Sequence, residues 1–209
     1  MTIEKIVKNL KRADWRAEVF WCLRDIERFC VRHWYTCMEG GKARMMGVRM
    51  GRGVVFMGKT RMERFKHSTI EIGDGCVFNA HPLFNQLCRS YSIIQTATDF
   101  AQIRIGRNSG FSGVRISSEV GVYIGNNVTV GANSMIMDRD WHHDLLGTKP
   151  APVRIGDNVF IGMDCKILKG VTIGDNAVIG AGSVVNKDIP ANAMAAGVPC
   201  RVIKMKSEE

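Results

Sequence analysis

The chain has 209 residues, of which 45% are apolar and 23% are charged; these values are typical of one globular domain and exclude a globally disordered chain. Its longest apolar runs are far shorter than the roughly 20 residues of a membrane-spanning helix, and no signal peptide is recognisable, so we expect a soluble, cytoplasmic protein. The cysteines form no Cys-x-x-Cys pair, which disfavours a disulfide framework or a zinc ribbon and indicates reduced thiols.

The net charge of +9 is concentrated near the amino terminus. Residues 1–66 hold 16 Lys and Arg against 7 Asp and Glu, an excess of +9, whereas residues 67–209 hold 13 of each kind. A basic segment of this kind favours contact with an anionic membrane surface or a nucleic acid, and it also occurs on ordinary solvated helices. Because no recognised nucleic-acid motif is present, we expect no nucleic-acid partner and retain a peripheral contact of residues 1–40 with the inner face of the membrane as one interpretation.

Residues 3–36 are predicted to form a helix, because their apolar residues recur at spacings of three and four with basic residues between them. Thr2 is a suitable N-cap, and the pair Gly40-Gly41 is expected to end the helical region. Residues 42–100 mix Gly-rich turns, methionines and short apolar runs, and the sequence does not predict how they fold.

From residue 155 onward the chain falls into units of six residues. The first position of each unit is apolar and β-branched: Ile155, Ile161, Ile167, Ile173, Ile179 and Val185. The same phase appears upstream at Ile72, Ile105 and Ile124, each followed by glycine. A six-residue period is that of a parallel β-helix, in which each unit is a short strand and a turn, and the first position points inward. We therefore predict a mainly β domain over residues 67–209, after a basic helical and mixed region over residues 1–66.

Residues 137–154, with the sequence MDRDWHHDLLGTKPAPVR, interrupt this period. An excursion from a regular coil is a common place for functional side chains. This one holds two adjacent histidines, His142 and His143, and a histidine is a suitable general base at neutral pH. Neighbouring side chains of an extended loop point to opposite sides, so we expect one of the two imidazoles to face a substrate.

Residues 171–204, VTIGDNAVIGAGSVVNKDIPANAMAAGVPCRVIK, are the most specific stretch. With the hexads, they resemble the hexapeptide-repeat acyltransferases, in particular the maltose, galactoside and polysaccharide O-acetyltransferases. Residues 110–116, GFSGVRI, together with DRDWHHD, are similar to the cell-surface polysaccharide and lipopolysaccharide branch. The resemblance implies a left-handed parallel β-helix, transfer of an acetyl group from acetyl-CoA to a sugar hydroxyl without a covalent intermediate, and a homotrimer whose active sites lie in clefts between neighbouring columns.

The same resemblance assigns roles to individual residues. It implies that His142 is the general base, that Asp140 or a backbone carbonyl orients its ring, and that His143 contacts the acceptor or replaces His142 as the base. The acceptor side also includes Ser112 in the floor of the cleft and Trp141 as a face for stacking on a sugar. Coenzyme A is implied to run along small residues and to meet basic side chains with its phosphates: Gly162, Ala181, Gly182, Lys187, Arg201 and Lys204.

Some alternatives stay open. The acceptor is an antibiotic, serine or an amino sugar in a second interpretation, and in a third the β-helix is a non-catalytic assembly module. Phe160 stands where the sugar acetyltransferases often carry Trp, so no stacking contact is assigned to it. We expect no metal, because β-helix enzymes that bind zinc carry histidines on successive coils, and the coils after residue 143 hold none.

Overall fold

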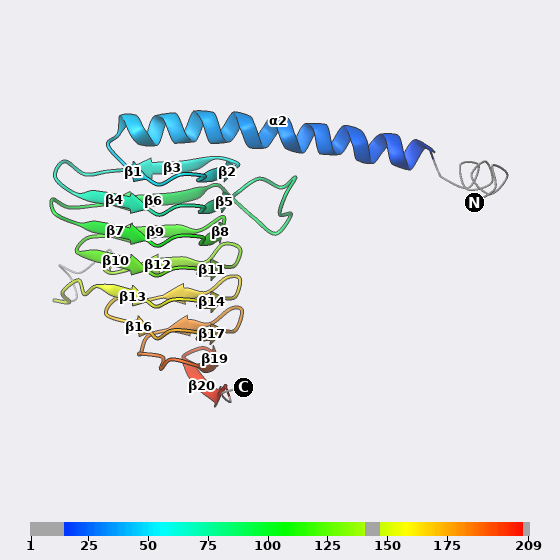
Figure 1. The fold of residues 1–209 in the computed structure, drawn as a ribbon. Helices are drawn as coiled ribbons and strands as arrows, with labels where there is room; N and C mark the ends of the chain where they lie inside the picture. The colour runs from blue at the N-terminus through cyan, green and yellow to red at the C-terminus, as the bar shows by residue number, and fades with distance from the viewer. Residues whose placement is uncertain (1–14, 141–146, 207–209) are drawn as a thin grey trace.

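The computed structural model describes residues 15–140 and 147–206. Within these ranges the chain forms one long helix, α2 (Trp15–Met45), and a column of short strands wound into three sheets (Figure 1). The helix lies across one end of the column and extends beyond its edge (Figure 1). The predicted fold class is confirmed: the protein is mainly β, a left-handed parallel β-helix with an N-terminal α-helical region.

Each of the first six coils contributes one strand to each sheet, and the last two strands of the chain both belong to the same sheet. Sheet 1 consists of β1 (Arg49–Met50), β4 (Thr69–Ile72), β7 (Gln102–Ile105), β10 (Gly121–Ile124), β13 (Val153–Ile155) and β16 (Thr172–Ile173). Sheet 2 consists of β2 (Val55–Met57), β5 (Val77–Asn79), β8 (Gly110–Ser112), β11 (Thr129–Val130), β14 (Phe160–Ile161), β17 (Val178–Ile179), β19 (Ala193–Gly197) and β20 (Cys200–Met205). Sheet 3 consists of β3 (Thr60–Glu63), β6 (Ser92–Thr96), β9 (Arg115–Ser118), β12 (Met135–Met137), β15 (Lys166–Ile167) and β18 (Val184–Val185). We call the turns that join the sheets the 1–2, 2–3 and 3–1 corners.

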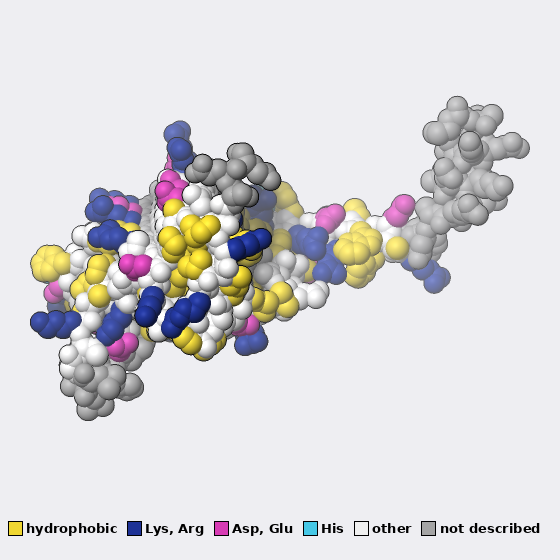
Figure 2. Space-filling model, turned by 90° about the horizontal axis from the view of Figure 1, so that it is seen from below, with side chains coloured by type: hydrophobic (Ala, Val, Ile, Leu, Met, Phe, Trp, Pro, Cys, Tyr) yellow, Lys and Arg dark blue, Asp and Glu magenta, His cyan; other side chains and the backbone are white. Residues whose placement is uncertain are grey.

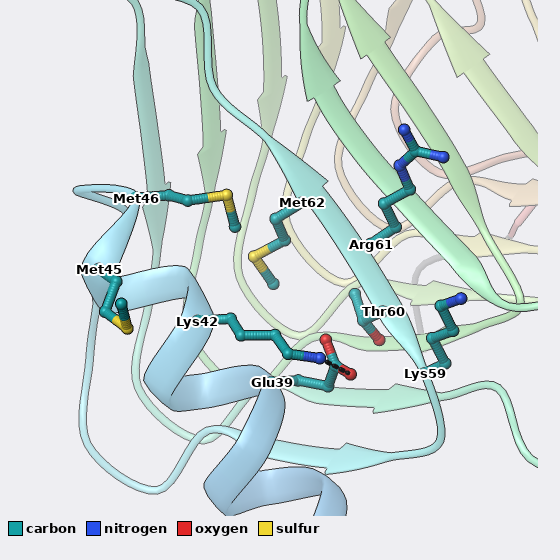
Figure 3. A pocket seen from close by; sticks show the side chains of 8 residues that line it. All are labelled: Glu39, Lys42, Met45, Met46, Lys59, Thr60, Arg61 and Met62. Atoms are coloured by element: carbon teal, nitrogen blue, oxygen red, sulfur yellow. Dashed lines mark hydrogen bonds and ion pairs between the residues drawn. The ribbon is translucent and has the colours of Figure 1, made fainter.

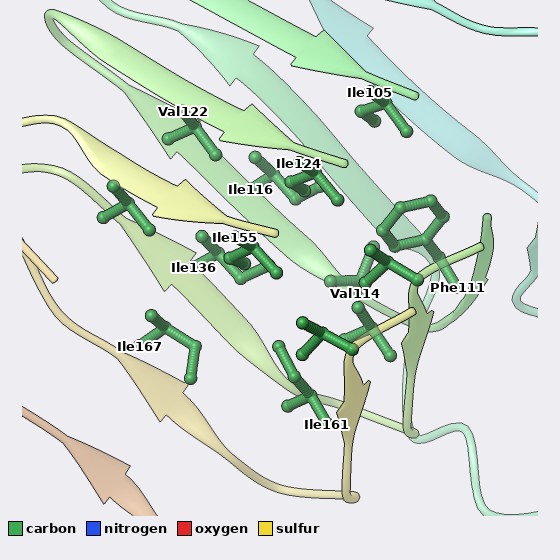
Figure 4. Packing of buried hydrophobic residues seen from close by; sticks show 14 of the residues in the cluster. Ile105, Phe111, Val114, Ile116, Val122, Ile124, Ile136, Ile155, Ile161 and Ile167 are labelled. Atoms are coloured by element: carbon green, nitrogen blue, oxygen red, sulfur yellow. The ribbon is translucent and has the colours of Figure 1, made fainter. Parts of the chain in front are cut away.

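The hexads set the register of the last coils. Phe160 pairs with Val178 and Lys166 pairs with Val184, so residues eighteen positions apart, or three hexads, lie side by side. The first position of each hexad points into the column, where burial of its branched side chain stabilises the stack. Figure 4 shows this interior, and its fully buried members include Ile136, Ile161, Ile167, Ile173 and Ile179.

Aromatic side chains fill the coils nearest to α2. The rings of Phe56, Phe78 and Phe111 stack along sheet 2 with centroids 5.3 and 5.1 Å apart. Asparagines line the 1–2 corner on the later coils, where Asn127, Asn158 and Asn176 have φ values of 55°, 56° and 59°. Their side-chain amides form a ladder, because each donates to the next at 3.0–3.2 Å. Asparagine tolerates the left-handed conformation that these turns require.

The helix continues past its predicted end, because Gly40 and Gly41 lie inside α2. Gly40 is buried at the point where α2 crosses the column, and a Cβ on it would lie 3.9 Å from the Phe56 ring. The helix ends instead before Gly47, which has a φ of +77° and donates its N–H to the Arg44 carbonyl at 2.9 Å. A glycine in the left-handed conformation is a common helix stop.

The β-helix begins before the predicted boundary at residue 67, because β1, β2 and β3 form a first coil that pairs with the second. The helix covers the open end of this coil. The Thr36 hydroxyl accepts a hydrogen bond from the Phe56 N–H at 3.1 Å and donates to the Phe56 carbonyl at 3.2 Å, and Ala43 is completely buried. Covering an unpaired edge prevents unwanted strand addition. No helix of the described residues is long and apolar enough to cross a membrane.

Two long connections leave the coil in the part of the chain that the structure describes. Residues 80–91 join β5 to β6 at the 2–3 corner and extend beneath α2 (Figure 1). Residues 138–152, which we call the excursion, join β12 to β13 at the 3–1 corner. The second connection is the interruption predicted from the hexads.

Candidate active site

The excursion is fixed at its start by Asp138, whose side chain is completely buried. The carboxylate accepts hydrogen bonds from the Ser118 hydroxyl at 2.9 Å and from three successive backbone N–H groups in the turn between β9 and β10 at 2.7–2.8 Å. The other end of the excursion returns to the same place, because the Ala151 N–H donates to the Asp138 carbonyl at 2.9 Å. Hydrogen bonds to a buried carboxylate are strong, so the base of the excursion is held tightly.

Asp140 is held at the same corner. Its Oδ2 atom lies 2.6 Å from Lys169 Nζ, in the turn that follows β15, and accepts a hydrogen bond from the Thr148 hydroxyl at 3.0 Å. A further ion pair joins Arg139 to Glu119 at 3.4 Å, and both side chains are largely buried. Asp140 was predicted to orient the catalytic histidine, and its described partners include Lys169 and Thr148. The described parts of the excursion are therefore tied to the coils on both sides of it.

Trp141, His142 and His143, predicted as the base and acceptor residues, lie outside the described residues, as does Asp144. The other histidines occupy separate places near α2. The Nδ1 atom of His33 lies 2.8 Å from the Phe29 carbonyl on the helix. His67 pairs with Asp99 at 3.1 Å, and His81 accepts a hydrogen bond from a backbone N–H in the connection 80–91.

Gly162, Ala181 and Gly182, predicted to line the coenzyme, come together at the 2–3 corner on adjacent coils. Gly162 is buried, and a Cβ on it would lie 2.5 Å from the Ala181 nitrogen, so the stacking of coils by itself requires glycine there. Ala181 and Gly182 are exposed, and no described atom lies within 4 Å of a Cβ placed on Gly182. The open surface for a ligand is therefore at residues 181–182. Ser112, at the end of β8, lies at the same corner two coils nearer to α2.

The predicted phosphate-binding residues lie on the last coil and are all exposed. Lys187 is at the 3–1 corner, and Arg201 and Lys204 are on β20. Neither lysine makes an ion pair within the part of the chain that the structure describes, and Arg201 donates to its neighbouring carbonyl at 2.7 Å. Figure 2 shows Lys and Arg side chains distributed over this end of the column, opposite to α2.

The predicted residues thus form two groups in one chain. The excursion, Asp140 and Lys187 lie at the 3–1 corner, whereas Gly162 and Ala181 lie at the 2–3 corner. The strands of sheet 3 separate these corners. The structure of one chain therefore does not bring the whole predicted site together.

A hollow of about 320 Å³ lies on the outer face of sheet 3, between the two corners and beside the start of the excursion. Its walls are apolar and polar side chains from three neighbouring strands: Ile93, Gln95, Arg115, Ser117, Met135 and Met137. A second hollow of about 360 Å³ lies between α2 and β3 on the first coil, where Lys42 and Glu39 approach to 3.4 Å (Figure 3). The first of the two is the one that adjoins the excursion.

The buried thiols of the column have raised pKa values. Burial raises the pKa of the Cys165 thiol, which lies near the 2–3 corner, so this group stays protonated at neutral pH. Cys76 and Cys200 are buried, and their pKa values are raised for the same reason. Among the described residues no group of His, Cys, Asp and Glu is placed to hold a metal ion.

Sequence reasoning missed Asp138 and Lys169. The signal for Asp138 was available, because Ile136 points inward and Met137 outward, so the alternation places residue 138 inward again. A carboxylate at a core position needs several hydrogen-bond donors, so its presence indicates that a neighbouring turn supplies them. Lys169 carried no such signal, because only the winding of the coil brings it beside Asp140.

Two family models match the chain. The bacterial transferase hexapeptide model (six repeats) matches residues 152–187, and the hexapeptide repeat of succinyl-transferase matches residues 102–137. Both matches lie in the column, and residues 138–151 of the excursion fall between them.

Curated relatives extend this likeness. The chain is 47% identical to the galactoside O-acetyltransferase of Escherichia coli (strain K12) over 111 residues, which are 50% of this chain and 54% of the relative. It is 36% identical to a putative acetyltransferase of Staphylococcus aureus (strain MRSA252) over 142 residues, which are 56% of this chain and 68% of the relative. The chain spans about half the length of the first curated relatives it matches.

Among solved structures, the chain is similar to AntD, an N-acyltransferase from Bacillus cereus in complex with dTDP and 3-hydroxybutyryl-CoA. The TM-score is 0.62 at 19% sequence identity, and the match covers 80% of this chain and 88% of that one. At this identity the likeness shows the fold alone.

Proposed function

This chain belongs to the hexapeptide-repeat acyltransferase family, and on that premise we propose that it transfers an acetyl group from acetyl-CoA to a sugar hydroxyl. The observation that carries the proposal is the anchored excursion. It leaves a hexapeptide column at one corner, it is fixed by a buried carboxylate with four donors, and its sequence holds two adjacent histidines. The relative named a galactoside O-acetyltransferase supports a sugar as the acceptor.

Acetyl transfer to a hydroxyl needs two partners held close together and a base that takes the hydroxyl proton. In the proposed mechanism His142 takes that proton as the sugar oxygen attacks the thioester carbonyl. The carbon–sulfur bond then breaks, the acetyl group stays on the sugar oxygen, and His142 returns the proton to the coenzyme A sulfur. The three other histidines are less suited, because each has a local partner on α2 or the first coils.

The exposed surface at residues 181–182 fits the pantetheine arm of coenzyme A, because small residues there leave the backbone open. The basic residues at the same end of the column fit the phosphates of the nucleotide. Arg201 offers a fork of donors, and Lys187 and Lys204 offer point charges that no described carboxylate neutralises.

We propose that the active unit is a homotrimer, with each site shared by two chains. The excursion and the proposed coenzyme surface lie at different corners of one column, so a site that uses both needs the 3–1 corner of one chain beside the 2–3 corner of its neighbour. A threefold arrangement of parallel columns closes such heterologous contacts into a ring. The hollow on sheet 3 would then be covered by the neighbouring chain.

The acceptor in this proposal is a sugar in the making of a surface polysaccharide or lipopolysaccharide, modified on the cytoplasmic side of the membrane. The support is the likeness of residues 110–116 and of the DRDWHHD segment to that branch of the family. An antibiotic, serine or amino sugar as the acceptor would be found in the same assay.

The test is acetyl-CoA turnover with a panel of sugars, amino sugars, serine and an aminoglycoside. His142→Ala is expected to lower kcat by about 10²- to 10⁴-fold, which is the usual contribution of a general base, while coenzyme A binding measured by calorimetry is unchanged. His67→Ala is the matched control, since His67 has a carboxylate partner at a similar corner on an earlier coil.

Three results would contradict the proposal. Full activity of His142→Ala together with loss in His143→Ala would move the base to the neighbouring residue. Full activity of both variants would remove the excursion from the chemistry. Absence of coenzyme A binding in the wild type would favour an assembly module.

A further inference from the structure

Apolar side chains cover the outward side of α2. The helix packs on the first coil through Thr36, Glu39 and Ala43, of which the last two are buried. Each residue of a helix is rotated by about 100° from the one before it. Six exposed side chains fall in one arc of about 80° on the side opposite to those three residues, and we call them the outward stripe: Val19, Leu23, Ile26, Cys30, Trp34 and Cys37. Phe20, Trp21 and Phe29 are also exposed and lie outside this arc.

The side chains of the outward stripe are highly exposed for large apolar residues. Trp34 is 63% exposed and Leu23 is 61% exposed. Exposed apolar side chains in a continuous patch mark an interaction surface, whereas single ones do not. The stripe spans residues 19–37 of α2, a helix that lies partly across the end of the column and partly beyond its edge (Figure 1).

The charge around the stripe indicates what covers it. Exposed arginines, Arg16 and Arg44, stand on the same side of α2 at its two ends. The sequence before them adds four basic residues against two acidic ones in residues 1–14, and residues 1–66 together carry all of the net charge of +9. A helix with an apolar face of Trp, Phe and Leu and with basic residues around it binds in the plane of an anionic lipid surface.

We propose that α2 binds an anionic membrane surface through the outward stripe. The stripe faces away from the end of the column, so in a trimer of parallel columns the three stripes lie at one end and face the same direction. Three coplanar stripes suit a flat surface, and they cannot cover one another within the trimer. No helix of the described residues is suited to cross the bilayer, so the contact is interfacial.

The experiment is flotation of the full chain with vesicles of phosphatidylcholine, alone and mixed with phosphatidylglycerol. Trp34→Ala is compared with Trp21→Ala, a control matched in chemistry and in exposure, 63% against 52%. Trp21 precedes Glu39 by eighteen residues, or five full turns, so it points to the side of α2 that faces the column. Thermal melts and acetyl-CoA turnover report whether each variant folds.

We expect the wild type to float with the mixed vesicles, less at high salt, and not with phosphatidylcholine alone. Trp34→Ala is expected to weaken the binding roughly tenfold, because burial of one large apolar side chain accounts for about that factor, and Trp21→Ala is expected to change it less than about twofold. Vesicles should also protect Cys30 and Cys37 from a thiol reagent.

Two outcomes would overturn the proposal. The first is a wild type that stays with the bulk solution, or an equal loss of binding in both tryptophan variants. The second is an assembly larger than a trimer in the absence of lipid that Trp34→Ala converts to trimers, since a second copy of the chain would then cover the stripe. Neither outcome changes the proposed acetyl transfer, which is measured separately on soluble sugars.

Discussion

A shared active site predicts that two inactive variants restore each other. Ala181→Trp places a large side chain on the exposed 2–3 corner and should block coenzyme A, whereas His142→Ala removes the proposed base. Each pure trimer should be inactive. In trimers assembled from both chains, some sites combine the intact excursion of one chain with the intact corner of its neighbour.

The distance across one column is what makes this test decisive. Each face of the column is about six residues wide, or roughly 20 Å at 3.3 Å per residue. Asp140 is fixed to Lys169 at the 3–1 corner, and His142 follows it by only two residues, a span of at most about 7 Å. Two residues of chain beyond Asp140 therefore do not span the width of the face that separates it from residues 181–182 of the same chain.

When the two chains are mixed in equal amounts, half of the sites receive an intact excursion. Independently, half of the sites receive an intact 2–3 corner. Random assembly should thus restore roughly one quarter of the wild-type activity in the unfractionated mixture, and roughly one third in the isolated mixed trimers, where one site of the three is intact. The assay is acetyl-CoA turnover after the chains are expressed together and the mixed trimers are isolated by two different tags. Ala191→Trp is the matched control, because Ala191 stacks on Gly174 at the 1–2 corner as Ala181 stacks on Gly162 at the 2–3 corner. The Ala191→Trp variant should keep its activity. Mixed trimers without activity would show that one chain supplies both halves of the site.

The remaining predictions concern stability and thiol reactivity. Asp138→Ala should lower the free energy of unfolding by about 3 kcal/mol in urea titrations, because it leaves buried donors without an acceptor. Hydrogen bonds donated by the Asn126 backbone N–H and side-chain amide lower the pKa of Asp157. The ionised Asp157 carboxylate therefore stabilises the fold above the ordinary carboxyl pKa, and this stabilisation is lost as the pH falls through the lowered pKa. The difference in Tm between the wild type and Asp157→Asn should therefore shrink below about pH 4. At pH 7.5 three thiols of the native protein should react with a colorimetric thiol reagent, and the rest should react only after denaturation; the reactive ones are Cys22, Cys30 and Cys37. Rapid reaction of all seven would contradict the burial of the other four.

The repeat was predictable from the sequence because a β-helix places one residue of every six in the same environment. Ile161, Ile167 and Ile173 are buried in turn, so the demand for a branched apolar side chain is visible as a period. The first coil escaped this reasoning because Phe56 replaces the usual isoleucine, and because its residues pair across more than the eighteen positions of three hexads. Val55 pairs with Val77, twenty-two positions away, and Thr60 pairs with Ser92, thirty-two positions away.

The end of the helix was mispredicted for a related reason. The pair Gly40-Gly41 predicts a stop, whereas both residues lie inside α2 and Gly40 is buried against the first coil, a packing that only the tertiary structure reveals. The true stop, Gly47, differs from them in its left-handed backbone rather than in its residue type. In the site, the excursion was visible as a break in the period, but its ties to Lys169 and Ser118 depend on the winding of neighbouring coils.

A column of regular coils offers little room for catalysis by itself. Its outer faces are convex or flat, and the hollow of about 320 Å³ beside the excursion is open to solvent on the face of sheet 3. Acyl transfer from a thioester competes with hydrolysis, so water must be excluded from the bound pair. In the proposed trimer, the neighbouring chain would supply the wall that a single column lacks. On that proposal, a side chain of the excursion would meet a substrate bound on the neighbouring column and would have to be placed accurately relative to its own column. The buried Asp138 carboxylate at the base of the excursion suits this requirement.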